Sequence, residues 1–167
     1  MKLPLIVTLQ LEKPAADFFS LQRKTYFPAH INYLDAHLTL FHVLPSGETI
    51  IKKTIESICQ RNEFNLEVTG IKNIGNGVAY NIESQELSAM HLNMQKEFDS
   101  FLTGKDRGKL WPHITIQNKV TAFKALTLYQ KLSSEFKPFS VKATGISTWK
   151  YLDGPWEHVE DFSFTRI

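Results

Sequence analysis

Cysteine is nearly absent from this sequence of 167 residues, because Cys59 is the only one. A lone cysteine excludes an intramolecular disulfide and a metal site built from several cysteines. Its place in an apolar helical pattern predicts a buried, unreactive thiol. Long apolar runs are missing too, since none approaches the roughly 18 residues of a membrane-spanning helix. Segment 1–10 is apolar but lacks a small-residue cleavage site, so we expect a first strand, not a signal peptide, and a cytoplasmic protein without membrane contact.

A strong charge of either sign is also missing. The net charge is +2 and the pI is about 8.6, which is too mild for a protein that coats nucleic acid, although a local basic patch could still hold an anion or an RNA end. Hydrophobic residues make up 43% and charged residues 22%, as in ordinary globular proteins. Linkers and low-complexity segments are lacking. We therefore expect one domain over residues 1–167, and a monomer.

The sequence does contain a short pattern that occurs twice. His37 to Leu40 and His113 to Ile116 both read His, apolar, Thr, apolar. In a β-strand, alternate side chains share a face, so the His and the Thr would point to one side and the aliphatic pair to the other. Two such strands facing each other would form a cleft with two imidazoles and two hydroxyls.

A second similarity extends this pattern into a longer repeat. Phe64 to Ile71 and Phe139 to Ile146 both read Phe, polar, aliphatic, charged, small aliphatic, Thr, Gly, Ile, and each follows its His-Thr motif at nearly the same separation, across a helical pattern. Self-similarity at a fixed spacing indicates a duplicated architecture. It predicts two similar lobes, each of which brings one His-Thr strand to a shared groove.

The paired motifs offer what the cleavage of a phosphodiester requires. With a free pKa of about 6.5, one imidazole can be neutral and act as a base while the other is protonated and acts as an acid. The threonine hydroxyls can donate hydrogen bonds to the nonbridging oxygens. Neither motif contains a carboxylate, and the nearest one, Asp35, stands alone. We therefore predict chemistry without a metal ion and without a cofactor.

These residues resemble the 2H phosphoesterase superfamily, which includes bacterial 2′-5′ RNA ligase-like proteins and RNA 2′,3′-cyclic phosphodiesterases. Its signature is a pair of His-apolar-Thr/Ser-apolar motifs about half a chain apart, and the resemblance covers nearly the whole chain. It implies an α+β fold with a bilobal, pseudo-twofold arrangement of two antiparallel β-sheets, helices on the outside and a central groove. It also implies that His37 and His113 divide the acid and base roles, while Thr39 and Thr115 bind the phosphate.

Further candidates for substrate binding flank the two motifs. Phe41 and Gln117 hold the next positions on the same face. There an aromatic ring could stack on a nucleobase and an amide could form a hydrogen bond with one, although packing within the sheet explains both residues equally well. The loop before the second motif is basic and aromatic, with Lys105, Arg107, Lys109 and Trp111. Loops often select substrates, so these residues are candidates for phosphate or nucleotide contact, although such a basic run is more often simply solvated.

Two other residues near the motifs receive weaker assignments. His42 has the opposite parity to His37 on the predicted strand, so we expect it to point away from the groove. Tyr151 lies beside an Asp-Gly-Pro turn, where it could line one rim of the groove or close the end of the sheet.

The prediction is therefore an enzyme, a metal-independent phosphodiesterase that opens a 2′,3′-cyclic phosphate or a related 2′-linked phosphodiester of an RNA end or a small nucleotide. One alternative is a non-catalytic module that binds a nucleotide or an RNA end. Another keeps the chemistry but acts on cyclic ADP-ribose phosphate or on 2′-5′ or cyclic oligonucleotides. Two complete motifs favour an enzyme, because a binding module does not need two titrating imidazoles. The sequence leaves open which histidine is the acid.

Overall fold

The computed structural model describes residues 2–165, which form four α-helices and a sheet of seven strands. None of the helices in this range combines the length and the apolar character needed to span a membrane. The strands are β1 (Pro4–Leu11), β2 (Leu38–Pro45), β3 (Phe64–Asn73), β4 (Val78–Glu83), β5 (His113–Gln117), β6 (Phe139–Tyr151) and β7 (Trp156–Ser163). The helices are α1 (Lys13–Tyr26), α2 (Thr49–Ile58), α3 (Gln85–Glu97) and α4 (Ala122–Glu135), with short 3₁₀ helices η1 (Ala29–Ile31), η2 (Asp99–Phe101) and η3 (Gly104–Arg107).

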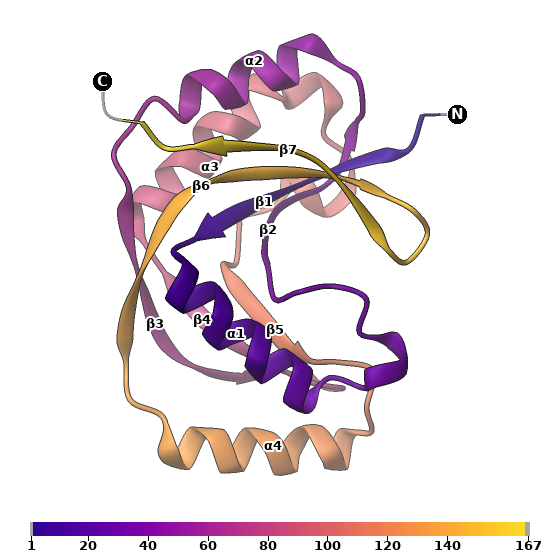
Figure 1. Ribbon diagram of the computed structural model, residues 1–167, viewed down its shortest axis with the longest axis vertical. Coiled ribbons are helices and arrows are strands. Elements are labelled where there is room, and N and C mark those ends of the chain that lie inside the picture. The colour runs from indigo at the N-terminus through magenta and orange to yellow at the C-terminus, as the bar shows by residue number, and fades with distance from the viewer. Residues whose placement is uncertain (1, 166–167) are drawn as a thin grey trace.

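The strands are ordered β2-β1-β6-β3-β4-β5, with β7 on β6, and every pair is antiparallel. Figure 1 shows the sheet curving between two ends, with α2 and α3 at one end and α4 at the other, while α1 packs along β5. The α+β class with an antiparallel sheet and outer helices is thus confirmed. The two expected sheets are joined into one, because β3 pairs with the first half of β6.

The ladder between β3 and β6 reveals a pseudo-twofold relation between the halves. Leu66 pairs with Val141, and these residues hold the same position in the two Phe…Thr-Gly-Ile segments. Antiparallel strands that pair equivalent residues are related by a local twofold axis through that pair. On either side of it the chain repeats the order β-α-β-α-β, first as β1-α1-β2-α2-β3 and then as β4-α3-β5-α4-β6. The His-Thr strands β2 and β5 are the two ends of the strand order and occupy equivalent places.

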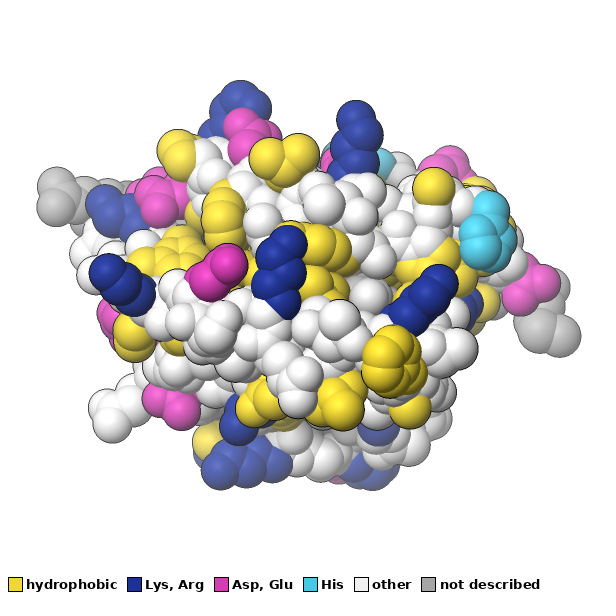
Figure 2. All heavy atoms as spheres, turned by 90° about the horizontal axis from the view of Figure 1, so that it is seen from below, with side chains coloured by type: hydrophobic (Ala, Val, Ile, Leu, Met, Phe, Trp, Pro, Cys, Tyr) yellow, Lys and Arg dark blue, Asp and Glu magenta, His cyan; other side chains and the backbone are white. Residues whose placement is uncertain are grey.

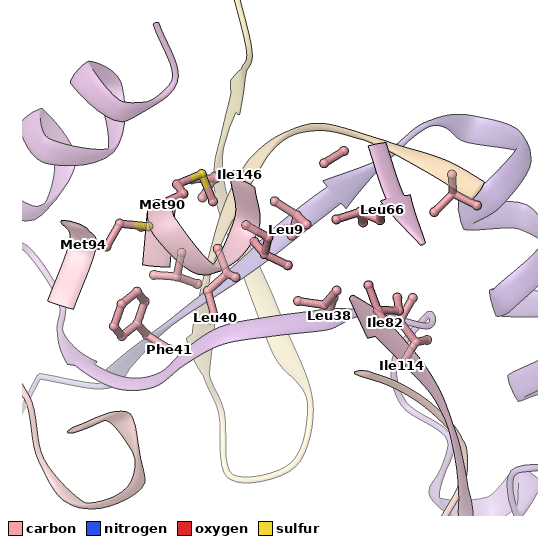
Figure 3. Packing of buried hydrophobic residues seen from close by; sticks show 14 of the residues in the cluster. Leu9, Leu38, Leu40, Phe41, Leu66, Ile82, Met90, Met94, Ile114 and Ile146 are labelled. Atoms are coloured by element: carbon pink, nitrogen blue, oxygen red, sulfur yellow. The ribbon is translucent and has the colours of Figure 1, made fainter. Parts of the chain in front are cut away.

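The aliphatic residues of both motifs anchor these end strands in the core. Leu38 and Leu40 are at most 2% exposed, and Ile114 and Ile116 are fully buried. Figure 3 shows Leu38 near Ile114 from the opposite lobe, while Leu40 lies toward α3. Burying such a side chain contributes about 1.5–3 kcal/mol, so the apolar half of each motif holds the polar half in place.

Gly145, the glycine of the second Thr-Gly-Ile segment, pairs with Gln10 on β1. A Cβ at this position would overlap the side-chain oxygen of Gln10 and the carbonyl oxygen of Phe162. We expect Gly145→Ala to lower the free energy of unfolding by about 1–3 kcal/mol, the usual cost of overpacking. A Cβ added to the equivalent Gly70 would meet no atom within 4 Å, so Gly70→Ala serves as the control and should be neutral or slightly stabilising. Urea unfolding measures both, and equal losses would contradict this account of Gly145.

Candidate active site

His37 and His113 are held in the same way by the backbone of their own segments. His37 directly precedes β2 and places its Nδ1 2.9 Å from the carbonyl oxygen of Asp35. His113 begins β5 and places its Nδ1 2.7 Å from the carbonyl oxygen of Trp111. A carbonyl oxygen only accepts hydrogen bonds, so Nδ1 must be the protonated donor in both rings. Each neutral imidazole therefore keeps its lone pair on Nε2, the atom that is free to exchange a proton with a substrate.

Each of the two imidazoles also lies against a tryptophan. Trp111 stacks on His113 with a centroid distance of 3.9 Å and an interplanar angle of 14°. The indole N–H of Trp111 donates to Oδ1 of Asn81 at 2.7 Å, and Asn81 pairs with His113 across the β4–β5 ladder. At the other histidine, Trp156 of β7 lies 4.6 Å from the ring of His37. These contacts restrict the rotation of the imidazoles and partly remove them from water.

The two histidines influence each other and lie at the starts of strands that approach each other. The pKa of His37 is lowered to about 4, mainly by burial and in part by the charges of Arg23, His113 and His42, while its bond to a backbone carbonyl acts in the opposite direction. Burial also lowers the pKa of His113, and His42 and Lys105 act in the same direction. Residues of β2 and β5 approach within 8 Å between Cα atoms. The structure therefore brings the two histidines near each other.

Thr39 and Thr115 lie two residues beyond their histidines and are only partly buried, although the residues on either side of them are buried. The alternation expected of a strand thus holds as far as each threonine. Among the hydrogen bonds found within residues 2–165, none involves either hydroxyl. Both hydroxyl groups are therefore available to donate to a ligand oxygen beside the imidazoles.

Directly after each threonine the alternation breaks at a β-bulge. A bulge places two residues of one strand opposite one residue of the other and reverses the facing of the residues beyond it. The extra residue is Leu40 on β2 and Ile116 on β5. The ladders locate both bulges, since Thr8 pairs with Thr39 and Val7 with Phe41, whereas Ala79 pairs with Thr115 and Val78 with Gln117.

The bulges overturn the placement expected for Phe41 and Gln117 on the groove face. Phe41 has no exposed surface and stacks on His91 at 4.7 Å in the core. Gln117 is 7% exposed and lines a shallow pocket of about 260 Å³ beside Tyr26 and α4. Figure 2 shows the face that carries α4, where apolar side chains lie among lysines and arginines. Strict period-2 counting along each motif strand fails because it ignores the extra residue.

The candidate residues in the loop before β5 have different surroundings. Lys105 lies near enough to His113 to lower its pKa. Arg107 instead bonds Asp99, with its Nη1 3.2 Å from Oδ1 and its Nη2 3.0 Å from the carbonyl oxygen. Lys109 is exposed. Tyr151 is 37% exposed at the end of β6, where it pairs with Trp156 of β7, the strand that also covers His37.

Arg23 lies beside both motifs, although no motif in the sequence marks it. It is 6% exposed on α1, and its Nε donates to Oδ1 of Asn32 at 2.8 Å while its Nη1 donates to the carbonyl oxygen of Thr115 at 3.2 Å. Burial lowers the pKa of Arg23 to about 10, against the opposing effect of Asp35. The one available signal is helical spacing, because Arg23 continues the buried face of Ala15 and Phe19.

The contact between His42 and Asp106 is a second feature that no motif in the sequence marks. The carboxylate of Asp106 accepts the backbone N–H of His42 at 2.9 Å and that of Val43 at 2.8 Å, and its Oδ1 lies 3.1 Å from Nδ1 of His42. Burial alone would raise the pKa of Asp106, but the hydrogen bonds from residues 42 and 43 outweigh burial and lower it. The bulge at Leu40 turns His42, not Phe41, toward the site, contrary to the parity expected from the sequence.

Residues 11–155 match the sequence model of the 2′-5′ RNA ligase superfamily. Among solved structures, TT0787 of Thermus thermophilus is 13% identical with a TM-score of 0.67, and 98% of each chain is covered. LigT of E. coli in complex with 3′-AMP is 13% identical with a TM-score of 0.63 over 99% of this chain and 100% of LigT, and LigT has also been solved with ATP and with NADP+. A phosphoesterase is 14% identical with a TM-score of 0.63, over 99% of this chain and 100% of that one. No curated protein matches the sequence.

Proposed function

Because the chain belongs to the 2′-5′ RNA ligase superfamily, we propose that it is a phosphodiesterase that opens a 2′,3′-cyclic phosphate, or a related 2′-linked phosphodiester, of an RNA end or a nucleotide. The observation that carries this proposal is the matched pair of imidazoles, each with Nδ1 bound to a backbone carbonyl and Nε2 left for proton transfer. The fold shared with LigT, which has been solved with 3′-AMP, ATP and NADP+, supports a substrate of nucleotide size.

The two histidines divide the proton transfers between them. The pKa of His37 is lowered to about 4, so above that pH its ring is neutral and Nε2 takes a proton from the attacking water. The water oxygen forms a bond to phosphorus, and the bond between phosphorus and the 3′ oxygen breaks. His113 begins protonated and gives its Nε2 proton to the departing 3′ oxygen. The product is a 2′-phosphate, and the two rings regain their starting protonation states from solvent.

The remaining groups stabilise the charge that develops on the phosphate. The hydroxyls of Thr39 and Thr115 donate to the nonbridging oxygens from both sides, because each lies on the same face as its histidine. Arg23 supplies a permanent positive charge near His37, and its bond to the carbonyl oxygen of Thr115 connects it to the second motif. Since imidazoles, hydroxyls and a guanidinium cover the proton transfers and the charge, the proposed reaction is independent of a metal ion.

The test is turnover of 2′,3′-cyclic nucleotides and of RNA ended by a cyclic phosphate, with purified protein in EDTA. We expect full activity and a bell-shaped profile of kcat/KM against pH. Because the pKa values of both histidines are lowered, activity should fall as His37 gains a proton below about pH 4 and as His113 loses one, which places the optimum on the acid side of neutrality. Loss of turnover in EDTA would refute the metal-free mechanism, and saturable binding without turnover would favour a binding module.

A further inference from the structure

We propose that His42, held by Asp106, forms with Lys105 a second anion-binding subsite beside the two-histidine centre. This subsite takes an additional phosphate of the substrate, the 5′-phosphate of the nucleotide whose cyclic phosphate is opened. The inference rests on the proposed function and narrows its substrate class to nucleotides with a 5′-phosphate, as a monoester or as the diester of an RNA strand.

The direction of the His42 side chain is set by the bulge on β2. Thr39 pairs with Thr8 and Phe41 with Val7, so the extra residue Leu40 lies between them. Phe41 is thereby turned into the core, where it has no exposed surface. A second register shift follows, because Leu44 pairs with Leu5, so His42 and Val43 together lie opposite Ile6. Ile6 shares its face of β1 with Thr8, the partner of Thr39, and His42 thus takes the side on which Thr39 lies. Its exposed fraction of 41% shows that the ring reaches solvent there.

The orientation of the ring is set by Asp106. This carboxylate is 2% exposed, and it binds His42 through both the backbone N–H and Nδ1. A second backbone N–H, that of Val43, completes its set of donors. Because Nδ1 is bound on the buried side, Nε2 is the ring nitrogen left on the exposed side. The same loop places Lys105 one residue before Asp106.

The subsite lies beside both histidines of the centre. Asp106 holds η3 against β2 at residues 42 and 43, and residues of β2 lie within 8 Å of residues of β5 between Cα atoms. His42 lowers the pKa of both His37 and His113, and Lys105 lowers that of His113. Such effects require the charges to lie close together. His42 and Lys105 therefore lie beside the two-histidine centre, where the His42 ring is open to solvent.

A purely structural role accounts for only part of this arrangement. β2 is an end strand, and its free N–H groups at residues 42 and 43 need an acceptor, which Asp106 provides. That function does not need an imidazole at position 42. One reacting phosphate is already served by two imidazoles and two hydroxyls. The additional imidazole, and the lysine that precedes Asp106, therefore fit a second phosphate better than the first.

The direct test is binding of product analogues measured by calorimetry, which requires no turnover. The wild-type protein should bind adenosine 2′,5′-bisphosphate at least about tenfold more tightly than adenosine 2′-monophosphate. In the double variant His42→Gln with Lys105→Gln, this preference should shrink to less than about threefold. Lys53→Gln, at an exposed lysine on α2, is the control and should retain the full preference. A bisphosphate bound no better than the monophosphate, or a preference that survives in the double variant, would overturn the subsite.

Turnover then identifies the source of the second phosphate. The kcat/KM of a 5′-phosphorylated nucleoside 2′,3′-cyclic phosphate is compared with that of a dinucleotide ended by a cyclic phosphate and that of the unphosphorylated nucleoside cyclic phosphate. A higher value for the dinucleotide assigns the subsite to an RNA strand, and a higher value for the monoester assigns it to a free nucleotide. Equal values for all three would overturn the subsite while leaving the proposed function intact, whereas no turnover of any of them would refute the proposed function itself.

Discussion

Replacing His113 by alanine is expected to lower kcat for a 2′,3′-cyclic nucleotide by a factor of about 10²–10⁴, the usual contribution of a positioned general acid. Without its Nε2 proton, the 3′ oxygen must leave as an alkoxide. His37→Ala should cost a comparable factor, because the attacking water would lose the base that accepts its proton. Steady-state kinetics in EDTA with both single variants measures these losses.

The double variant provides a sharper test of the shared reaction. If both histidines act in one step, His37→Ala combined with His113→Ala should cost much less than the product of the two single factors, because groups that act as a unit are strongly non-additive. His30→Ala, at an exposed histidine in η1, is the matched control and should retain wild-type kcat. If either single variant turned over substrate at the wild-type rate, the proposed reaction could not take place at this site.

The motif strands are readable from the sequence because their information is local. A strand that buries Leu38 and Leu40 must turn Thr39 to the other face, and the same holds for Ile114, Ile116 and Thr115. The repeated Phe…Thr-Gly-Ile segments likewise predict a symmetric architecture, and the Leu66–Val141 pair lies at its axis. The equivalence of β1-α1 and β4-α3, the first two elements of each half, could not be predicted, because these segments have no sequence pattern in common.

The features that the sequence does not reveal depend on partners that are distant along the chain. The bulge after each threonine is defined by the register with β1 or β4, so neither the burial of Phe41 nor the turn of His42 can be inferred from β2 alone. The burial of Arg23 likewise requires β5, which supplies its carbonyl acceptor 92 residues away. The periodicity of apolar residues identifies the two faces of a strand or helix, but contacts with segments distant in the sequence determine what each face packs against.

Asp106→Asn is expected to lower the free energy of unfolding by about 2–4 kcal/mol at pH 7. The substitution preserves shape but turns one acceptor oxygen into an NH₂ group that faces the N–H groups of residues 42 and 43. Since the carboxylate is almost fully buried, water cannot replace the lost acceptor. Urea unfolding measures the change. Asp99→Asn, at the exposed carboxylate that pairs with Arg107, is the matched control and should change stability by less than about 1 kcal/mol.

The pH dependence separates the charge of Asp106 from its shape. Folding lowers the pKa of Asp106, so its ionised form stabilises the folded state above the unfolded pKa of about 3.9, and this contribution is lost as the pH falls through the folded pKa. Asparagine does not titrate. The stability gap between wild type and Asp106→Asn should therefore be widest near neutral pH and narrow toward pH 3, while the Asp99→Asn gap stays small throughout. A gap that is constant between pH 3 and pH 7 would mean that packing, and not the anchoring carboxylate, holds the loop of Asp106 against β2.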